Sequence, residues 1–169
     1  MAFDLPGVEV SSDIETLFKA VGFVVVQWGC AEQTLDMAVS IIFPLVKNKH
    51  KYTKQPVFLT QKTEFIRKHL DDHPALQQFS SEIAALLIRF EVAGKKRNDL
   101  IHGAIASLSP ENGAFHFAKL DIVKGDIPTV RPVSFDDAEW IDFRKELLSL
   151  GGDGIYLVKR VLEILKVQP

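Results

Sequence analysis

Arg97, Asn98 and His102 have the residue types and the spacing that suit proton transfer beside a phosphate group. The guanidinium of an arginine is permanently charged, and its planar fork of donors matches phosphoryl oxygens. The imidazole of a histidine can act as a base or as an acid. Asn98 precedes His102 by four residues, so on a helix its amide would lie beside the ring and could orient it or donate to phosphate. We therefore take this segment as the candidate catalytic site.

Arg97 and Glu32 each fall within an apolar helical stripe. At 100° per residue, Glu32 lies about 40° from Trp28 on one predicted helix, and Arg97 lies about 20° from Phe90 on another. Moving an unpaired charge out of water costs several kcal/mol, so both charges need partners. We therefore expect the two stripes to face each other, with Glu32 accepting hydrogen bonds from Arg97 and fixing the orientation of its fork. A structural ion pair that only sets the register of the helices is the alternative.

The basic residues near the end of the same predicted helix have a second explanation. Lys95, Lys96 and His102 fall in the last turns of a predicted helix, where the helix dipole favours cations, and Gly103 is a typical residue to follow a helix end. This explanation does not account for an arginine on the buried side of the segment.

A basic segment follows the first predicted helix. Between Lys47 and His69 the chain has seven basic residues and one acidic residue, although the whole chain has a net charge of −2. The negative total argues against a protein that coats nucleic acid by bulk charge. A local block of like charge is often a solvated surface, but beside a phosphate site it would bind flanking phosphates. The candidates for this role are Lys47, Lys49, Lys51 and Lys54.

No metal or cofactor site is predicted from the sequence. His69 and His73 have a spacing that can bind a metal from one helix face, but Pro74 disfavours helical backbone at His73. We expect a surface pair at the end of a helix, and we expect His50 to lie apart from other ligands. The single cysteine, Cys30, excludes an intramolecular disulfide.

The periodicity of apolar residues predicts four helices that position the candidate site. The first begins at Ser12 as N-cap and ends near Pro44; the second begins at Thr60 and ends at about Leu70; the third spans about Ala75–His102; and the last follows Ser134 as its cap. The last helix contains Gly151–Gly154. Because its apolar residues keep one phase across these glycines, we predict one unbroken helix whose glycines let a neighbour approach closely.

Between the third and last helices the pattern changes to alternation with period two. This pattern predicts a small antiparallel meander of strands at Ile105–Ser109, Phe115–Val123 and Thr129–Val133. The predicted fold is mainly α: a single domain over residues 1–169, built as an up-down four-helix bundle with the β-meander inserted before the last helix.

Composition is consistent with such a domain. The chain has 169 residues, of which 47% are hydrophobic and 25% are charged, as in ordinary soluble proteins. No uninterrupted apolar run approaches the roughly 20 residues that span a bilayer, and the N-terminal residues lack the features of a secretory signal. We therefore expect a cytoplasmic protein with no membrane association.

The segment from Arg97 to His102 resembles the signature of the HEPN superfamily, in which an arginine and a polar residue are followed by three residues and a histidine. Its place late in a helix of a four-helix bundle is similar too. Trp28 and Glu32 in a long first helix, a short lysine-rich second helix and a hairpin before the last helix resemble a bacterial subgroup of that superfamily.

The resemblance implies a metal-independent endoribonuclease that needs no cofactor and acts as a homodimer, in which Arg97 and His102 of two protomers converge. Two-fold symmetry would supply the second imidazole, because one ring cannot be both base and acid in one event. Lys95 and Lys96, with the four lysines of the basic segment, would bind RNA. A neutralising protein partner, as in a toxin–antitoxin pair, is compatible with this function.

The chain departs from some members of the superfamily at one position, and a second function is compatible with the resemblance. Some relatives have a tyrosine two positions after the histidine that accepts a regulatory nucleotide, whereas this chain has Ala104. The alternative function is a non-catalytic HEPN-like module that binds protein or nucleotide and regulates a partner.

Overall fold

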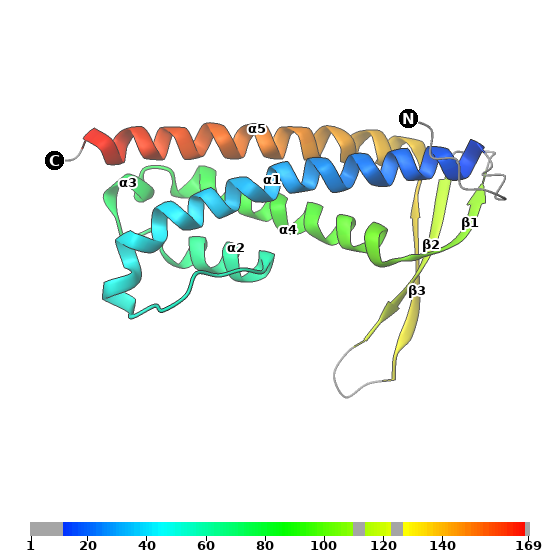
Figure 1. Ribbon diagram of the computed structural model, residues 1–169, viewed down its shortest axis with the longest axis horizontal. Helices are drawn as coiled ribbons and strands as arrows, with labels where there is room; N and C mark the ends of the chain where they lie inside the picture. The colour runs from blue at the N-terminus through cyan, green and yellow to red at the C-terminus, as the bar shows by residue number, and fades with distance from the viewer. Residues whose placement is uncertain (1–11, 110–113, 123–126, 168–169) are drawn as a thin grey trace, which may run out of the picture.

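The computed structural model describes residues 12–109, 114–122 and 127–167, which form a mainly helical molecule with one small sheet (Figure 1). The helices are α1 (Ser12–His50), α2 (Leu59–Lys68), the short α3 (Pro74–Gln77), α4 (Ser80–His102) and α5 (Asp137–Val167). Strands β1 (Ala104–Ser109), β2 (Ala114–Asp121) and β3 (Thr129–Phe135) lie between α4 and α5. The predicted helical fold, with an antiparallel sheet before the last helix, is confirmed.

The three long helices alternate in direction along the chain. Helices α1 and α5 run side by side in the same direction, α4 runs the opposite way beneath them, and α2 follows α1 beneath its C-terminal half (Figure 1). Phe90 of α4, which is fully buried, packs edge-on against Trp28 of α1 with ring centroids 6.2 Å apart. This contact fixes α4, and with it the segment that carries Arg97 and His102, against α1.

Helix α1 is longer than the sequence predicts, because it passes through Pro44 and ends at His50. Proline removes one backbone hydrogen bond and bends a helix rather than always ending it. Figure 1 shows α1 turning towards α2 over its last turns. The helix ends with Lys51 in the left-handed region (φ 54°) and the Tyr52 amide donating to the Lys47 carbonyl at 3.0 Å, a Schellman-type end.

Other helix boundaries also differ from the prediction. The predicted third helix is divided into α3 and α4, because Phe79 leaves helical geometry (φ −109°, ψ 6°). Helix α2 begins one residue before the predicted cap, Thr60, at Leu59. The cap of α5 is Asp136 rather than Ser134: its carboxylate accepts from the Glu139 amide at 2.8 Å. At α5 a side-chain hydrogen bond decides where the helix begins, and more than one polar residue nearby could offer it.

Helix α5 continues unbroken through Gly151–Gly154, as predicted, and one of these glycines allows a close approach to α1. A Cβ atom at Gly154 would lie 2.3 Å from Thr34 Oγ1 and 2.7 Å from Thr34 Cβ. The Thr34 hydroxyl donates to the Ala31 carbonyl at 2.7 Å, which holds that side chain in place. At Gly152 a Cβ atom would meet nothing within 4 Å.

Gly154→Ala is therefore expected to lower the free energy of unfolding by about 1–3 kcal/mol, because the added methyl group overpacks the contact between α1 and α5. Gly152→Ala is the matched control, and we expect it to be neutral or to stabilise by up to about 1 kcal/mol through helix propensity. Urea denaturation of the two variants measures the difference. Equal effects would contradict the close approach.

The sheet has the order β1-β2-β3, with antiparallel neighbours. Strand β3 lies at one edge, where Pro132 is in register with Ala118 of β2. Phe117 and Phe135 contact each other from neighbouring strands, and Phe135 packs on Trp140 and Phe143 of α5. The inner face of the sheet thus joins the core of the helices.

The length and composition of α1 would also allow it to cross a membrane, since an 18-residue window within Ile14–His50 has a mean hydropathy of 1.3. Gln27 and Glu32 interrupt the apolar run in the sequence without taking the helix outside this criterion. A core helix of a soluble protein meets the same criterion, and α1 supplies core residues along much of its length. This single helix is weak support for a membrane protein and does not conflict with a soluble one.

Candidate functional site

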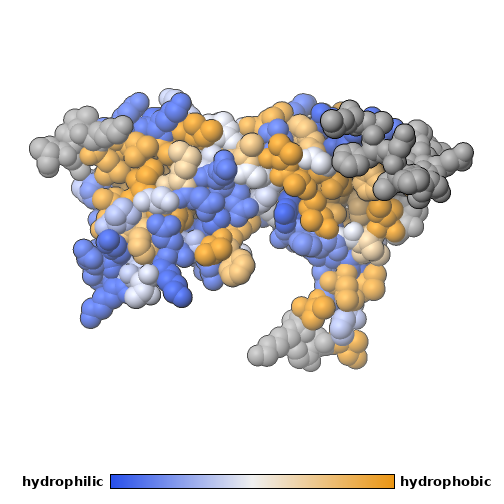
Figure 2. Space-filling view, viewed as in Figure 1, coloured by the Kyte–Doolittle hydropathy of each residue, from blue (hydrophilic) through white to orange (hydrophobic). Residues whose placement is uncertain are grey.

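The C-terminal end of α4 carries Arg97, Asn98 and His102 and leads directly into β1. Gly103 joins the two elements in an extended conformation (φ −80°, ψ 140°). A Cβ atom there would lie 2.7 Å from the Asp99 carbonyl oxygen and 2.9 Å from Phe117 Cβ, so the junction is tightly packed. In the orientation of Figure 1, the surface is hollowed between α2 and the sheet, below this part of α4 (Figure 2).

Arg97 is half-buried and incompletely paired. Its Nη1 donates to Asn98 Oδ1 at 2.9 Å, so the neighbouring amide orients the guanidinium. Within the described part of the chain, its Nε is the side-chain polar atom that is buried without a hydrogen-bond partner. An unpaired buried donor costs free energy, and such groups are rare in native structures unless a ligand or partner uses them.

His102 and Asn98 are exposed on neighbouring turns of α4. The His102 side chain makes no hydrogen bond or ion pair with another described residue. Its imidazole is accordingly accessible to a substrate or to a second copy of the chain. The structure thus brings Arg97 and Asn98 into contact and leaves His102 beside them on the surface.

The predicted pair between Glu32 and Arg97 is wrong. Glu32 instead accepts from the indole Nε1 of Trp28 at 2.8 Å and from Lys62 Nζ at 3.0 Å. Trp28 lies one turn before Glu32, and α2 brings Lys62 onto the same side of α1. Lys62 also contacts Asp36 at 2.7 Å. The acid in the apolar stripe is therefore paired with α2, and it does not position Arg97.

Lys62 is a buried cation held by two carboxylates. Burial alone would lower the pKa of its ammonium group, but hydrogen bonds to Asp36 and Glu32 outweigh that effect and raise the pKa above its ordinary value. Lys62 therefore stays charged and connects α2 to α1. Sequence reasoning placed this lysine among the basic surface residues and missed its structural role.

Asp99, within the same segment as Arg97 and His102, was not predicted as a site residue. It is buried and accepts hydrogen bonds from Lys119 of β2 and from Arg131 Nη2 of β3, the latter at 2.9 Å. Burial alone would raise the pKa of its carboxyl group, yet the hydrogen bonds from these two cations lower it overall. Asp99 anchors the sheet to the end of α4. Lys119 and Arg131 are opposite each other in the register of β2 and β3, which the sequence analysis did not predict.

The lysines predicted to bind RNA fall into two groups. Lys95 and Lys96 lie on α4 beside the candidate site, and neither forms an ion pair with another described residue. Lys47, Lys49, Lys51 and Lys54 are exposed at the C-terminal end of α1 and in the loop after it, and Lys49 forms an ion pair with Asp72. Figure 1 shows that the C-terminal ends of α1 and α4 lie well apart, so within one chain the second group does not flank Arg97.

No model of a known protein family, no curated protein and no solved structure matches this chain.

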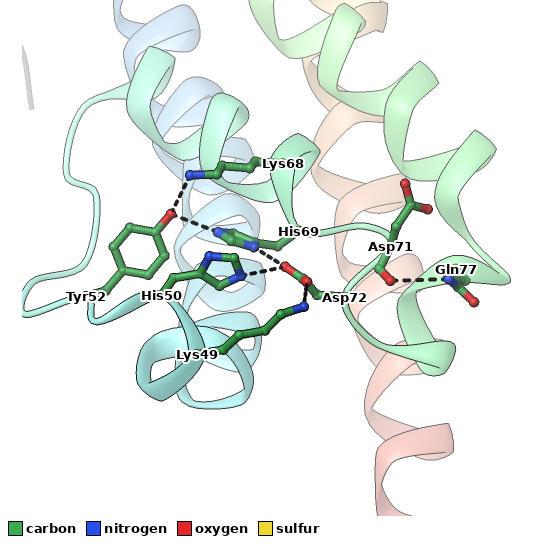
Figure 3. Close-up of polar contacts among 8 residues, drawn as sticks. All are labelled: Lys49, His50, Tyr52, Lys68, His69, Asp71, Asp72 and Gln77. Carbon is green, nitrogen blue, oxygen red and sulfur yellow. Dashed lines mark hydrogen bonds and ion pairs between the residues drawn. The ribbon is translucent and has the colours of Figure 1, made fainter.

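The structure also brings together a cluster that the sequence analysis did not predict (Figure 3). His69, the residue after α2, is fully buried, so the expected surface pair with His73 is wrong for His69. His50, expected to lie apart from other ligands, has its ring 4.6 Å from that of His69. Both imidazoles contact the carboxylate of Asp72. The bend and longer course of α1 beyond Pro44 bring His50 to this position, and the sequence pattern does not show them.

Lysine and tyrosine side chains surround this cluster. Lys49 donates to Asp72 Oδ1, and the hydroxyl of Tyr52 lies 3.0 Å from His69 Nε2. Lys68 donates to the same hydroxyl at 3.1 Å. Hydrogen bonds from Lys49 and then from His69 hold the pKa of the Asp72 carboxyl far below its ordinary value. Asp72 is therefore a carboxylate throughout the physiological range.

Proposed function

We propose that the chain is a metal-independent endoribonuclease that acts in the cytoplasm as a homodimer, with Arg97 and His102 as catalytic residues. The observation that carries the proposal is the state of Arg97: a half-buried guanidinium with an unpaired Nε, held by Asn98 beside an accessible imidazole. The permanent charge and planar fork of this guanidinium are suited to a phosphoryl oxygen.

The chemistry of RNA cleavage matches these groups. A base removes the proton of a 2′-hydroxyl, the 2′-oxygen bonds to the adjacent phosphorus, and the bond from phosphorus to the 5′-oxygen breaks as an acid protonates that oxygen. The products are a cyclic phosphate and a free 5′-hydroxyl. Arg97 would stabilise the charge that develops on the phosphoryl oxygens. The imidazoles of His102 in two protomers would supply the base and the acid.

The surroundings of Arg97 support binding of RNA there. Lys95 and Lys96 add positive charge on the same helix, and neither is neutralised by an acid of the described chain. Asn98 would orient the Arg97 fork, because Glu32 is paired with Lys62 and does not reach Arg97. The lysines at the end of α1 would reach RNA bound to the partner protomer or further along the strand.

The test is cleavage of a labelled RNA in the presence of a chelator, measured for the wild type and for Arg97→Ala and His102→Ala. Each variant is expected to lose at least about 100-fold in rate, since removing a general acid or base, or a group that stabilises charge in the transition state, typically costs that much or more. Circular dichroism and sedimentation should show an unchanged fold and an unchanged dimer. His116→Gln, which removes a histidine from β2, is expected to keep the wild-type rate.

Absence of cleavage by the wild type, or equal rates in all four proteins, would contradict the nuclease. Binding of a protein or nucleotide without cleavage would then favour the non-catalytic regulatory module.

A further inference from the structure

The side-chain cluster at the far end of α2 has the donor set of a metal centre. His50 comes from the last residue of α1, His69 from the residue after α2, and Asp72 from the turn that follows. Each offers one ligand atom, and these atoms all lie within 4.8 Å of one another. Two imidazoles and one carboxylate are the ligands that zinc and related divalent metals take in open sites, which leave a position for water.

One of the three distances between ligand atoms matches that of such a site, and all three atoms lie within 4.8 Å of one another. Ligands about 2.0–2.1 Å from a tetrahedral zinc ion are about 3.3 Å from each other. His50 Nε2 lies 3.2 Å from Asp72 Oδ2. His69 Nδ1 is hydrogen-bonded to the same oxygen. A metal ion would replace the hydrogen between them, and the His69 ring and the Asp72 carboxylate would move slightly apart.

Two of the three ligands have an outer partner that would remain in place around a metal ion. Lys49 uses Oδ1 of Asp72, which leaves Oδ2 for the ion. Tyr52 contacts Nε2 of His69, which leaves Nδ1 for the ion. A tyrosine hydroxyl can both donate and accept, so Tyr52 can bond His69 whichever ring nitrogen carries the hydrogen. Metal-binding histidines commonly have such a partner on the second nitrogen.

Burial also fits a metal centre. The side chains of His69 and Asp72 are 0% and 14% exposed, whereas that of His50 is 27% exposed, so an ion would enter from the side of His50. Figure 3 shows the two imidazoles side by side, with the Asp72 carboxylate facing both.

We propose that His50, His69 and Asp72 form a binding site for a divalent transition metal of the zinc type. The site joins the end of α1 to the end of α2 and to the turn after it, so the bound ion would stabilise this corner of the bundle. The site goes beyond the proposed nuclease function, because it is separate from Arg97 and His102 and the proposed cleavage uses no metal.

The experiment is a titration of the purified protein with Zn²⁺, followed by calorimetry, and with Co²⁺, followed by the visible absorption bands of a tetrahedral cobalt ion. The wild type is expected to bind one ion and to show these bands. His50→Gln removes the accessible ligand without disturbing buried His69, and it should weaken binding at least about 100-fold and abolish the bands. Tyr52→Phe keeps all three ligands and should weaken binding about 10-fold, as the loss of an outer partner typically does.

His73→Gln is the matched control, because His73 lies in the same turn but outside the proposed ligand set. It should bind Zn²⁺ as the wild type does. Thermal unfolding without metal establishes that each variant is folded. The proposal is overturned if the wild type binds no more tightly than His50→Gln, or if His73→Gln weakens binding as much as His50→Gln does. None of these measurements depends on RNA cleavage, so the metal site and the nuclease succeed or fail separately.

Discussion

Asp99→Asn is expected to lower the free energy of unfolding at pH 7 by about 3 kcal/mol, because it leaves two cations of the sheet without their buried partner. Lys119 and Arg131 both donate to Asp99 Oδ1, and the Asp99 side chain is 10% exposed. An asparagine of the same size keeps the packing and removes the charge. Urea denaturation at pH 7 measures the loss.

The effect of Asp99 should also depend on pH in a defined direction. Because the folded chain lowers the pKa of this carboxyl, its contribution to stability is present above the unfolded value of about 4 and disappears as the pH falls below it. The difference between the wild type and Asp99→Asn should therefore narrow progressively below about pH 4.

Asp121→Asn is the control for this prediction. Asp121 also pairs with Arg131, at 2.8 Å, but both side chains are more than a third exposed. Exposed ion pairs contribute about 1 kcal/mol or less, so this variant should be nearly neutral. If Asp121→Asn lowered the free energy of unfolding as much as Asp99→Asn does, the burial of Asp99 would not explain its contribution to stability.

Phe90→Ala is expected to destabilise the protein by about 3–5 kcal/mol, the usual cost of removing a large buried aromatic side chain. Phe90 is 0% exposed, and its edge contact with Trp28 holds α4 against α1. Because α4 also carries Arg97 and His102, the same change should reduce any activity of that segment at temperatures where the wild type is stable. Chemical denaturation and activity at two temperatures measure the two effects.

Ile88→Ala tests whether the loss is specific to the core. Ile88 lies two residues earlier on α4 but is 57% exposed. Its replacement should change stability by about 0.5 kcal/mol or less. Similar losses for Phe90 and Ile88 would contradict the packing of α4 described above.

The helical elements could be predicted because each has a long apolar stripe with one period. Trp28 and Phe90, chosen as the centres of two stripes, face each other in the structure. The continuity of α5 across its glycines followed from the same reasoning. Boundaries were predicted less well: Pro44 bends α1 without ending it, and Asp136 caps α5 in place of Ser134.

The partners of charged residues could not be predicted from stripes alone. The angle of a residue on a helix shows which side it faces, but not which of several opposite charges reaches it. Glu32 was placed correctly near the buried side, and yet Lys62 of α2 reaches it instead of Arg97. The cluster around Asp72 was missed for a related reason, since it joins residues from three segments whose approach depends on the bend of α1 and the course of the loop after it.

The position of Pro132 in β3 has a consequence for how the protein behaves at high concentration. An edge strand offers unpaired backbone groups to which a strand of another molecule can add, and exposed apolar side chains such as Val130 favour that contact. Proline has no amide hydrogen and is tolerated in sheets where that side faces solvent. Pro132 therefore interrupts the row of donors along the free edge of β3 and protects the folded protein against aggregation through this strand.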